Sequence, residues 1–217
     1  MNCEPNTRTS LFFTLTAKEK IAEAQYFLDR LPSLPLDKLR FEVSAFLAAT
    51  RSIFDHLLEE YRQKFLLGDI KRLSPETFEK NAERTSNEQA LKFIKWYQTQ
   101  MDSIRKDHEF LFDIRNLTIH SKTPRETITI EMRGPITVPA GTTTEIPFAF
   151  PPLGRPTKVE GTIRKTGSEM TEKVQAEIHT TAFFEEMPDK DLLTLCDEFL
   201  TRAKELVQQA ESLWGKT

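Results

Sequence analysis

Three polar side chains with complementary chemistry lie close together in the stretch DIRNLTIHSK, residues 113–122. On a helix, Asn116 and His120 are four residues apart and share a face, and Arg115 lies about 100° around from Asn116. Arg115 offers a fixed fork of donors that fits a phosphate, Asn116 offers a donor and an acceptor, and His120 titrates near neutral pH. The three side chains can therefore flank one groove.

This combination suits cleavage of a phosphodiester by the neighbouring ribose 2′-hydroxyl. The reaction removes a proton from the nucleophile, delivers a proton to the leaving oxygen and places extra negative charge on the phosphoryl oxygens. The sequence shows no acidic cluster and no His/Cys pair at ligand spacing, so it predicts neither a metal nor a cofactor. We predict Arg115, Asn116 and His120 as catalytic residues: Arg115 binds the scissile phosphate, His120 moves a proton and Asn116 orients the substrate or His120.

Two further cationic side chains are predicted to bind the substrate. Arg51 lies beside apolar positions of a long amphipathic segment, and Lys95 belongs to KFIKWYQTQ, which mixes cations with aromatic residues as nucleic-acid surfaces do. The same residues also fit surface ion pairs and lysines that extend over a core-facing helix. The motif itself also fits a solvated helix end, where cations favour the C-terminal dipole.

The elements that must position these residues are mainly helical. Apolar residues recur at three-and-four spacing over about 17–31, 36–67, 87–104 and 189–214. A capping box precedes the first segment at Thr16 and Glu19, and a short helix is expected to begin at Ser74, with Pro75 at its first position. A further helix is predicted over about 106–121, and it carries the motif.

The spacing of apolar residues changes after Pro124. ETITIEM, TEIPFAF and KVQAEIH alternate apolar and polar residues, which predicts an antiparallel sheet of three to five strands. The predicted class is therefore mainly α: an antiparallel helical bundle with a small antiparallel β-sheet inserted before the last helix. The predicted division is 11–122 for the first part of the bundle, 124–184 for the β-rich insert and 185–217 for the helix that packs back.

Composition narrows the possible functions and locations. The chain has 217 residues and a net charge of −3, which argues against a protein that coats nucleic acid electrostatically but leaves a small catalytic cleft possible. Its two cysteines, Cys3 and Cys196, form no disulfide framework or metal spacing. The N-terminal residues lack the layout of a secretion signal, and no apolar run approaches the roughly 20 residues that span a bilayer. We therefore expect a cytoplasmic protein without a membrane partner.

The chain resembles the HEPN superfamily, whose members are helical bundles marked by an arginine, a polar residue and a histidine at this separation. RNLTIH matches that motif residue by residue, as Arg115, Asn116 and His120. The segment FEVSAFLAATRSIFDHLLEEY, residues 41–61, is similar to the long helix that precedes the motif in many such proteins. The resemblance covers about 11–122 and 189–214, and the β-rich insert departs from it.

The resemblance implies a metal-independent endoribonuclease that leaves a 2′,3′-cyclic phosphate, as in toxin–antitoxin and anti-phage systems. It also implies a homodimer in which two copies of the motif form one site, with RNA as the substrate and an antitoxin or other protein as a partner. The alternative is a non-catalytic HEPN-like module that dimerises or binds a nucleotide or protein, with the β insert as its recognition surface. A third reading is an unrelated helical protein in which the motif is accidental.

Overall fold

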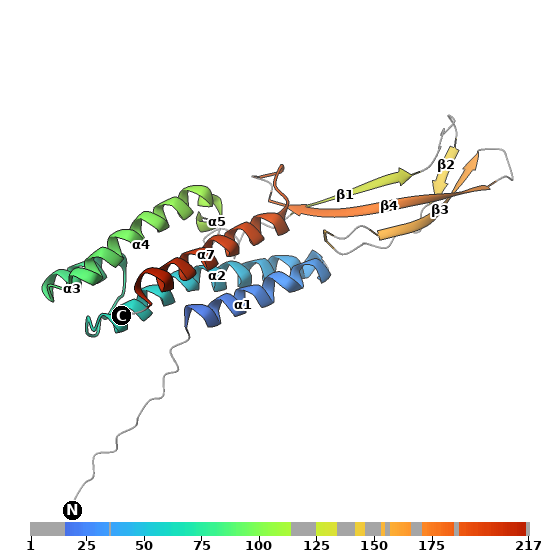
Figure 1. Cartoon of the computed structure of the whole chain (residues 1–217). Coiled ribbons are helices and arrows are strands. Elements are labelled where there is room, and N and C mark those ends of the chain that lie inside the picture. The colour runs from blue at the N-terminus through green and yellow to red at the C-terminus, as the bar shows by residue number, and fades with distance from the viewer. Residues whose placement is uncertain are drawn as a thin grey trace, which may run out of the picture.

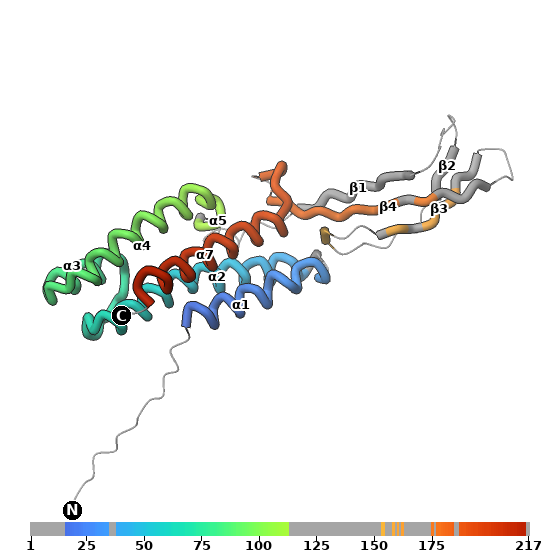
Figure 2. Tube along the Cα trace, viewed as in Figure 1, coloured from blue at the N-terminus to red at the C-terminus, as the bar shows by residue number. Residues whose placement is uncertain are grey.

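The computed structural model describes residues 16–34, 36–113, 125–133, 142–145, 153–154, 157–165, 171–184 and 187–215. Most of these residues are helical, so the predicted mainly α class is confirmed. The helices of the described part are α1 (Ala17–Arg30), a 3-10 turn η1 (Leu31–Ser33), α2 (Leu36–Lys64), α3 (Pro75–Arg84), α4 (Glu88–Asp107), α5 (Glu109–Asp113) and α7 (Leu192–Trp214). Figure 2 follows the chain through them.

The helix starts follow the capping signals of the sequence. The Thr16 hydroxyl accepts a hydrogen bond from the Glu19 amide at 3.2 Å, and the Glu19 carboxylate accepts one from the Thr16 amide at 2.6 Å. Ser74 caps α3 in the same reciprocal way with Thr77, and Pro75 follows at the first helical position. These bonds satisfy amide donors that have no partner within the helix. The predicted capping box and the predicted start of α3 are therefore confirmed.

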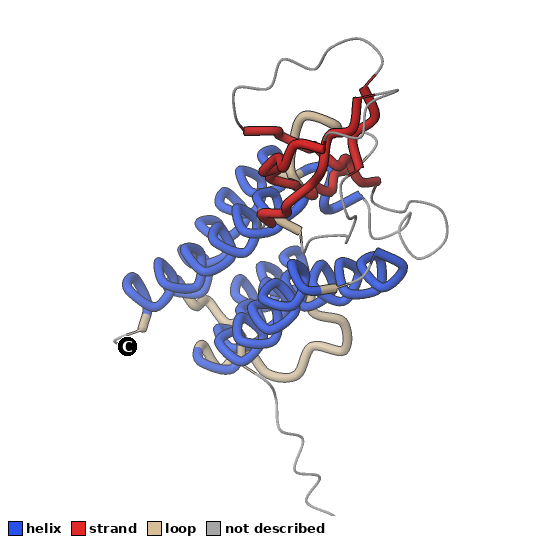
Figure 3. Tube along the Cα trace, turned by 90° about the vertical axis from the view of Figure 1, so that its right-hand side faces the viewer, coloured by secondary structure: helices blue, strands red, loops and turns tan. Residues whose placement is uncertain are grey.

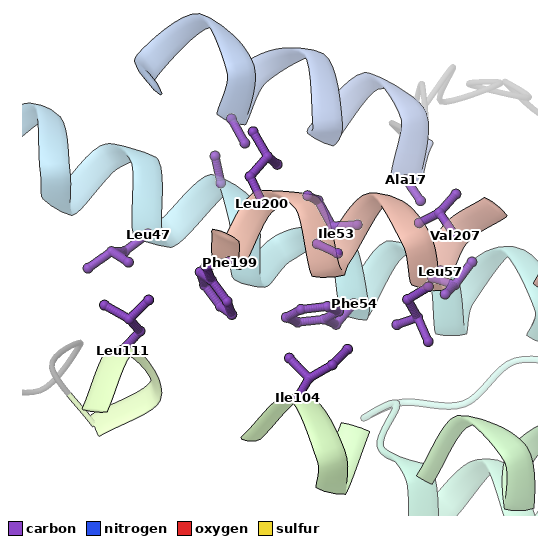
Figure 4. Packing of buried hydrophobic residues seen from close by; sticks show 14 of the residues in the cluster. Ala17, Leu47, Ile53, Phe54, Leu57, Ile104, Leu111, Phe199, Leu200 and Val207 are labelled. Carbon is purple, nitrogen blue, oxygen red and sulfur yellow. The ribbon is translucent and has the colours of Figure 1, made fainter. Parts of the chain in front are cut away.

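One hydrophobic core joins the helices. α1, α2 and α7 lie side by side, and α4 and α5 pack along the same core (Figure 1). Figure 4 shows Phe54 of α2 and Phe199 of α7 pointing toward each other, with Ile104 of α4 and Leu111 of α5 opposite them. Each of these side chains is at most 3% exposed. Burial of one such side chain stabilises the fold by about 1.5–3 kcal/mol.

A cluster of aromatic rings surrounds Phe93 at the opposite end of α4 from α5. The Phe93 ring stacks on Tyr61 of α2 with centroids 4.3 Å apart and meets Trp214 of α7 edge-on at 5.5 Å. Phe78 of α3 and Trp96 of α4 also contact it, with centroids 5.6 and 5.9 Å away. Since the rings come from four helices, the cluster ties α2, α3, α4 and α7 together.

The strands form one antiparallel sheet beyond the end of the helices. They are β1 (Arg125–Arg133), β2 (Thr142–Glu145), β3 (Thr157–Lys165) and β4 (Thr171–Phe183), in the order β1-β4-β3-β2. In the register of the sheet, Ile178 of β4 lies between Ile130 of β1 and Thr157 of β3. The sheet extends away from the helices (Figure 1), and all strands gather at one end of the helical part (Figure 3). The end of β4 approaches the helices, where Ala182 and Phe184 are buried.

Several predicted boundaries were wrong. The helix predicted over 106–121 is interrupted: α4 continues to Asp107, His108 leaves the helical conformation with φ −129° and ψ 31°, and α5 then runs from Glu109 to Asp113. The strand predicted within TEIPFAF appears as β2, which ends at Glu145, and residues 146–150 lie outside the described part. β3 was not predicted as a strand.

Among the described helices, none is long and apolar enough to cross a membrane.

Candidate functional site

The three predicted catalytic residues, Arg115, Asn116 and His120, lie outside the described residues. α5 ends at Asp113, and Phe112 is the last residue before the motif whose side chain is described. Their predicted roles stay predictions. The surroundings of Phe112 are the part of the candidate site for which geometry is known.

Phe112 lines an open, mostly polar pocket. The pocket has a volume of about 510 Å³ and lies between α2, the start of α3, α4 and α5. Its lining residues are Arg51, Phe54, Asp55, Pro75, Glu76, Tyr97, Gln98, Met101, Asp102, Arg105 and Phe112. This volume falls within the range of roughly 300–1,000 Å³ that is usual for small-molecule sites.

Two arginines converge on Phe112. The Arg51 guanidinium donates a hydrogen bond from Nη1 to the Phe112 carbonyl at 3.1 Å and lies 5.4 Å from the centre of its ring. The Arg105 guanidinium lies 5.7 Å from the same ring. Phe54 and Phe199 hold this ring from the core, with centroids 6.0 and 5.5 Å away. Cationic groups therefore concentrate at the end of the pocket formed by α5.

Three carboxylates also line the pocket. Asp55 lies one turn after Arg51 on α2, and Asp102 lies three residues before Arg105 on α4. Glu76 comes from the first turn of α3, where hydrogen bonds from Ser74 and from its own backbone amide lower its pKa. The pocket therefore combines a basic end with acidic side chains farther from α5.

Tyr97 forms a fixed wall of this pocket. Its hydroxyl donates a hydrogen bond to the Phe54 carbonyl at 3.2 Å, and its side chain is only 3% exposed. Burial raises the pKa of Tyr97 well above its ordinary value, and the charge of Asp55 raises it further. Tyr97 therefore stays protonated and contributes an aromatic surface to the pocket.

The two residues predicted to bind the substrate lie in different places. Arg51, predicted to bind the substrate, lines the pocket, whereas Lys95 is exposed on α4 and does not line it. Glu42, a further neighbour of the apolar stripe on α2, forms an ion pair with Arg30 of α1 at 2.8 Å. Arg105 was missed because its spacing along α4 carries no signal of what faces it. Only the position of Phe112 brings Arg51 and Arg105 together.

His108 occupies the break between α4 and α5 that precedes the motif. Its ring is buried against Phe199, with centroids 5.3 Å apart, and its Nδ1 atom has no hydrogen-bond partner among the described residues. Burial lowers the pKa of His108, and the nearby charges of Lys190 and Arg202 act in the same direction. The carboxylates of Asp107 and Glu198 oppose this shift without cancelling it. The folded protein therefore favours the neutral imidazole.

The position of His108 predicts a specific dependence of stability on pH. Below about pH 6.5, the ordinary pKa of histidine, the unfolded chain binds a proton at His108 more readily than the folded chain. The free energy of unfolding should therefore decrease as the pH is lowered from about 6.5 to the lowered pKa of His108 in the folded state. His108→Gln should reduce this fall by about 1.4 kcal/mol per unit of pKa difference. Urea unfolding of the unaltered chain and of His108→Gln near pH 7.5 and near pH 5.5 measures this difference. An equal decrease in the free energy of unfolding between the two pH values in both proteins would contradict the prediction.

The remaining reactive groups do not form a second site in the described part. No group of three or more His, Cys, Asp and Glu residues there could hold a metal ion. Cys196 is fully buried in α7, and burial raises the pKa of its thiol, so it is held as an unreactive core residue. The pocket at Phe112 is therefore the feature whose chemistry we pursue.

Comparisons with models of protein families, with curated proteins and with solved structures found no match to the chain. The resemblance to HEPN proteins therefore stays a prediction that depends on the motif and on the amphipathic helices. The chemistry of the pocket is independent of that resemblance. A cationic end suits an anionic group such as a phosphate, and ionised carboxylates suit a partner with hydrogen-bond donors.

Proposed function

We propose that the chain is a metal-independent endoribonuclease of HEPN type, with its helices in the antiparallel bundle of that family. It cleaves RNA by attack of the 2′-hydroxyl and leaves a 2′,3′-cyclic phosphate and a free 5′-hydroxyl. In this proposal Arg115 stabilises the charge on the phosphoryl oxygens, His120 transfers a proton and Asn116 orients the substrate. The protein works in the cytoplasm.

One observation carries the proposal: the Arg-Asn-x-x-x-His motif begins two residues after α5, and α5 contributes Phe112 to a polar pocket with a cationic end. Arg51 and Arg105 supply positive charge at this end. A single-stranded RNA that enters this pocket would meet cationic and aromatic groups, and both kinds of group favour RNA binding. The local basic end also suits a chain whose net charge is −3, because catalysis at one phosphate needs no basic surface elsewhere.

The proposal includes a homodimer and a protein that restrains the activity. Two copies of the motif would supply one composite site, so that each scissile phosphate meets a pair of arginines and a pair of histidines. An antitoxin or another regulatory protein is the expected partner. The sheet, which extends away from the helices in Figure 1, offers a surface separate from the pocket for such a protein.

The test is cleavage of RNA in the presence of a chelator. The purified chain is incubated with a mixed cellular RNA in excess EDTA, and the fragment ends are characterised. We expect cleavage at an unchanged rate with chelator, and 2′,3′-cyclic phosphate ends that acid opens to a mixture of 2′- and 3′-phosphates. Cleavage that disappears with EDTA or leaves 5′-phosphate ends would refute the mechanism. A folded chain that cleaves no RNA would instead support the non-catalytic binding module.

A further inference from the structure

The charged residues of the pocket at Phe112 are ordered along its length. Arg51 and Arg105 both contact Phe112, so the basic end of the pocket lies at α5. Asp55 lies one turn beyond Arg51 along α2, and Asp102 precedes Arg105 on α4, so both carboxylates are farther from α5. A ligand that lies along the pocket therefore meets cations at one end and anions at the other.

The basic end suits a phosphate group. The hydrogen bond from Arg51 to the Phe112 carbonyl fixes the position of its guanidinium, and the guanidinium of Arg105 is held over the same aromatic ring. Guanidinium groups pair well with phosphate because their N–H donors match its oxygens. This end of the pocket is formed by α5, which precedes the motif by two residues in the sequence.

The acidic part suits a base with two adjacent hydrogen-bond donors. The side chains of Asp55 and Asp102 are exposed, and their carboxylate oxygens are hydrogen-bond acceptors. Guanine alone among the four RNA bases presents two neighbouring donors, N1–H and the 2-amino group, on its Watson–Crick edge. Adenine and cytosine place a ring nitrogen acceptor beside their amino group, and uracil flanks its one donor with carbonyl oxygens. Each of these three would bring a lone pair against the carboxylate.

We infer that this pocket binds the guanine nucleotide unit of an RNA substrate, with Asp55 and Asp102 accepting hydrogen bonds from the base and Arg51 and Arg105 holding its phosphate. The volume of about 510 Å³ accommodates one nucleotide. The Tyr97 ring, fixed by its bond to the Phe54 carbonyl, lends an aromatic wall. This inference rests on the proposed function only for the statement that the nucleotide belongs to an RNA substrate. It makes the two aspartates specificity-determining residues.

Direct binding of mononucleotides tests the pocket without any cleavage. Full-length His120→Ala protein is titrated calorimetrically with GMP, AMP, CMP and UMP. We expect GMP to bind roughly tenfold or more tightly than the other three, because the lost hydrogen bonds involve a charged acceptor. Asp55→Asn and Asp102→Asn should each weaken GMP binding by about 10–100-fold and reduce the preference over AMP. Asp197→Asn removes a carboxylate from the exposed face of α7 and should leave binding unchanged.

The outcomes separate this inference from the proposed nuclease activity. Equal affinity for the four nucleotides, or unchanged GMP binding in both pocket variants, would overturn the guanine pocket. If the unaltered chain still cleaves RNA in that case, the proposed function stands without it. If GMP binds as expected but the unaltered chain cleaves no RNA, the pocket stands and the nuclease is wrong. Circular dichroism of each variant confirms that the fold is retained.

Discussion

Replacing His120 with alanine is expected to slow RNA cleavage by roughly 10²–10⁴-fold, the usual contribution of a positioned acid or base. Arg115→Ala should lower the rate by about 10²–10³-fold, because the developing charge on the phosphoryl oxygens loses its main donor. If the two residues act on one phosphodiester, the double variant should be scarcely slower than the more damaged single variant. Rates are measured on a defined single-stranded RNA that contains guanine, with EDTA present throughout.

Matched controls isolate the motif from general effects of removing charge. His56→Ala removes an imidazole from α2 that hydrogen-bonds to the Ser52 carbonyl at 2.7 Å and does not line the pocket. Arg84→Ala removes an exposed guanidinium from the last turn of α3. Both control proteins should cleave RNA at the rate of the unaltered chain. Folded His120→Ala and Arg115→Ala proteins with full activity would end the nuclease proposal.

The helices could be predicted because their burial imposes a period on the sequence. In α2, the buried residues Phe46, Thr50, Ile53, Leu57 and Tyr61 recur every three or four residues, and each is at most 4% exposed. The predicted helix nevertheless ran three residues past Lys64, where α2 ends. Leu66 adopts a left-handed conformation with φ 54°, and an apolar residue there continues the pattern without continuing the helix. Periodicity predicts which face is buried better than it predicts where a helix stops.

The break at His108 and the strand β3 were missed for related reasons. The apolar pattern continues from Ile104 to Leu111 across the break, and both side chains are buried although His108 itself is not helical. Tertiary packing therefore preserves the pattern that a continuous helix would also produce. In β3, only Val159 and Ile163 are apolar, and Gly161 between them has no side chain, so the alternation is weak and pairing with β4 and β2 supports the strand.

The candidate site was the least predictable part because it is assembled from distant segments. Arg51 and Arg105 are separated by the C-terminal part of α2, all of α3 and most of α4, yet both contact the Phe112 ring. No spacing rule relates residues that far apart in the chain. The prediction that Arg51 binds the substrate, made from its place beside the apolar stripe of α2, stays a prediction, and the structure shows only that Arg51 lines the pocket. The sequence alone does not show that the carboxylates and the two arginines line one pocket, because that depends on the position of Phe112 in the fold.

Replacing Phe93 with alanine is expected to lower the free energy of unfolding by about 3–5 kcal/mol, the usual cost of removing a fully buried aromatic ring. Phe93 is 0% exposed, and its ring meets Tyr61, Phe78 and Trp214 from three other helices. The cavity left behind cannot close easily, because these rings are themselves held by different elements. The melting temperature should fall by roughly 10 °C for a domain of this size.

Urea unfolding followed by tryptophan fluorescence measures this loss in the free energy of unfolding with probes close to Phe93. The chain has two tryptophans, Trp96 and Trp214, and both rings lie within 6 Å of Phe93. Phe41→Ala is the matched control, because Phe41 is 61% exposed on α2 and should change stability by less than about 0.5 kcal/mol. A loss in Phe93→Ala no larger than in Phe41→Ala would show that the ring does not anchor the core. A large loss would establish that α3, α4 and the end of α7, and with them the α4 wall of the pocket, depend on a ring cluster remote from α5.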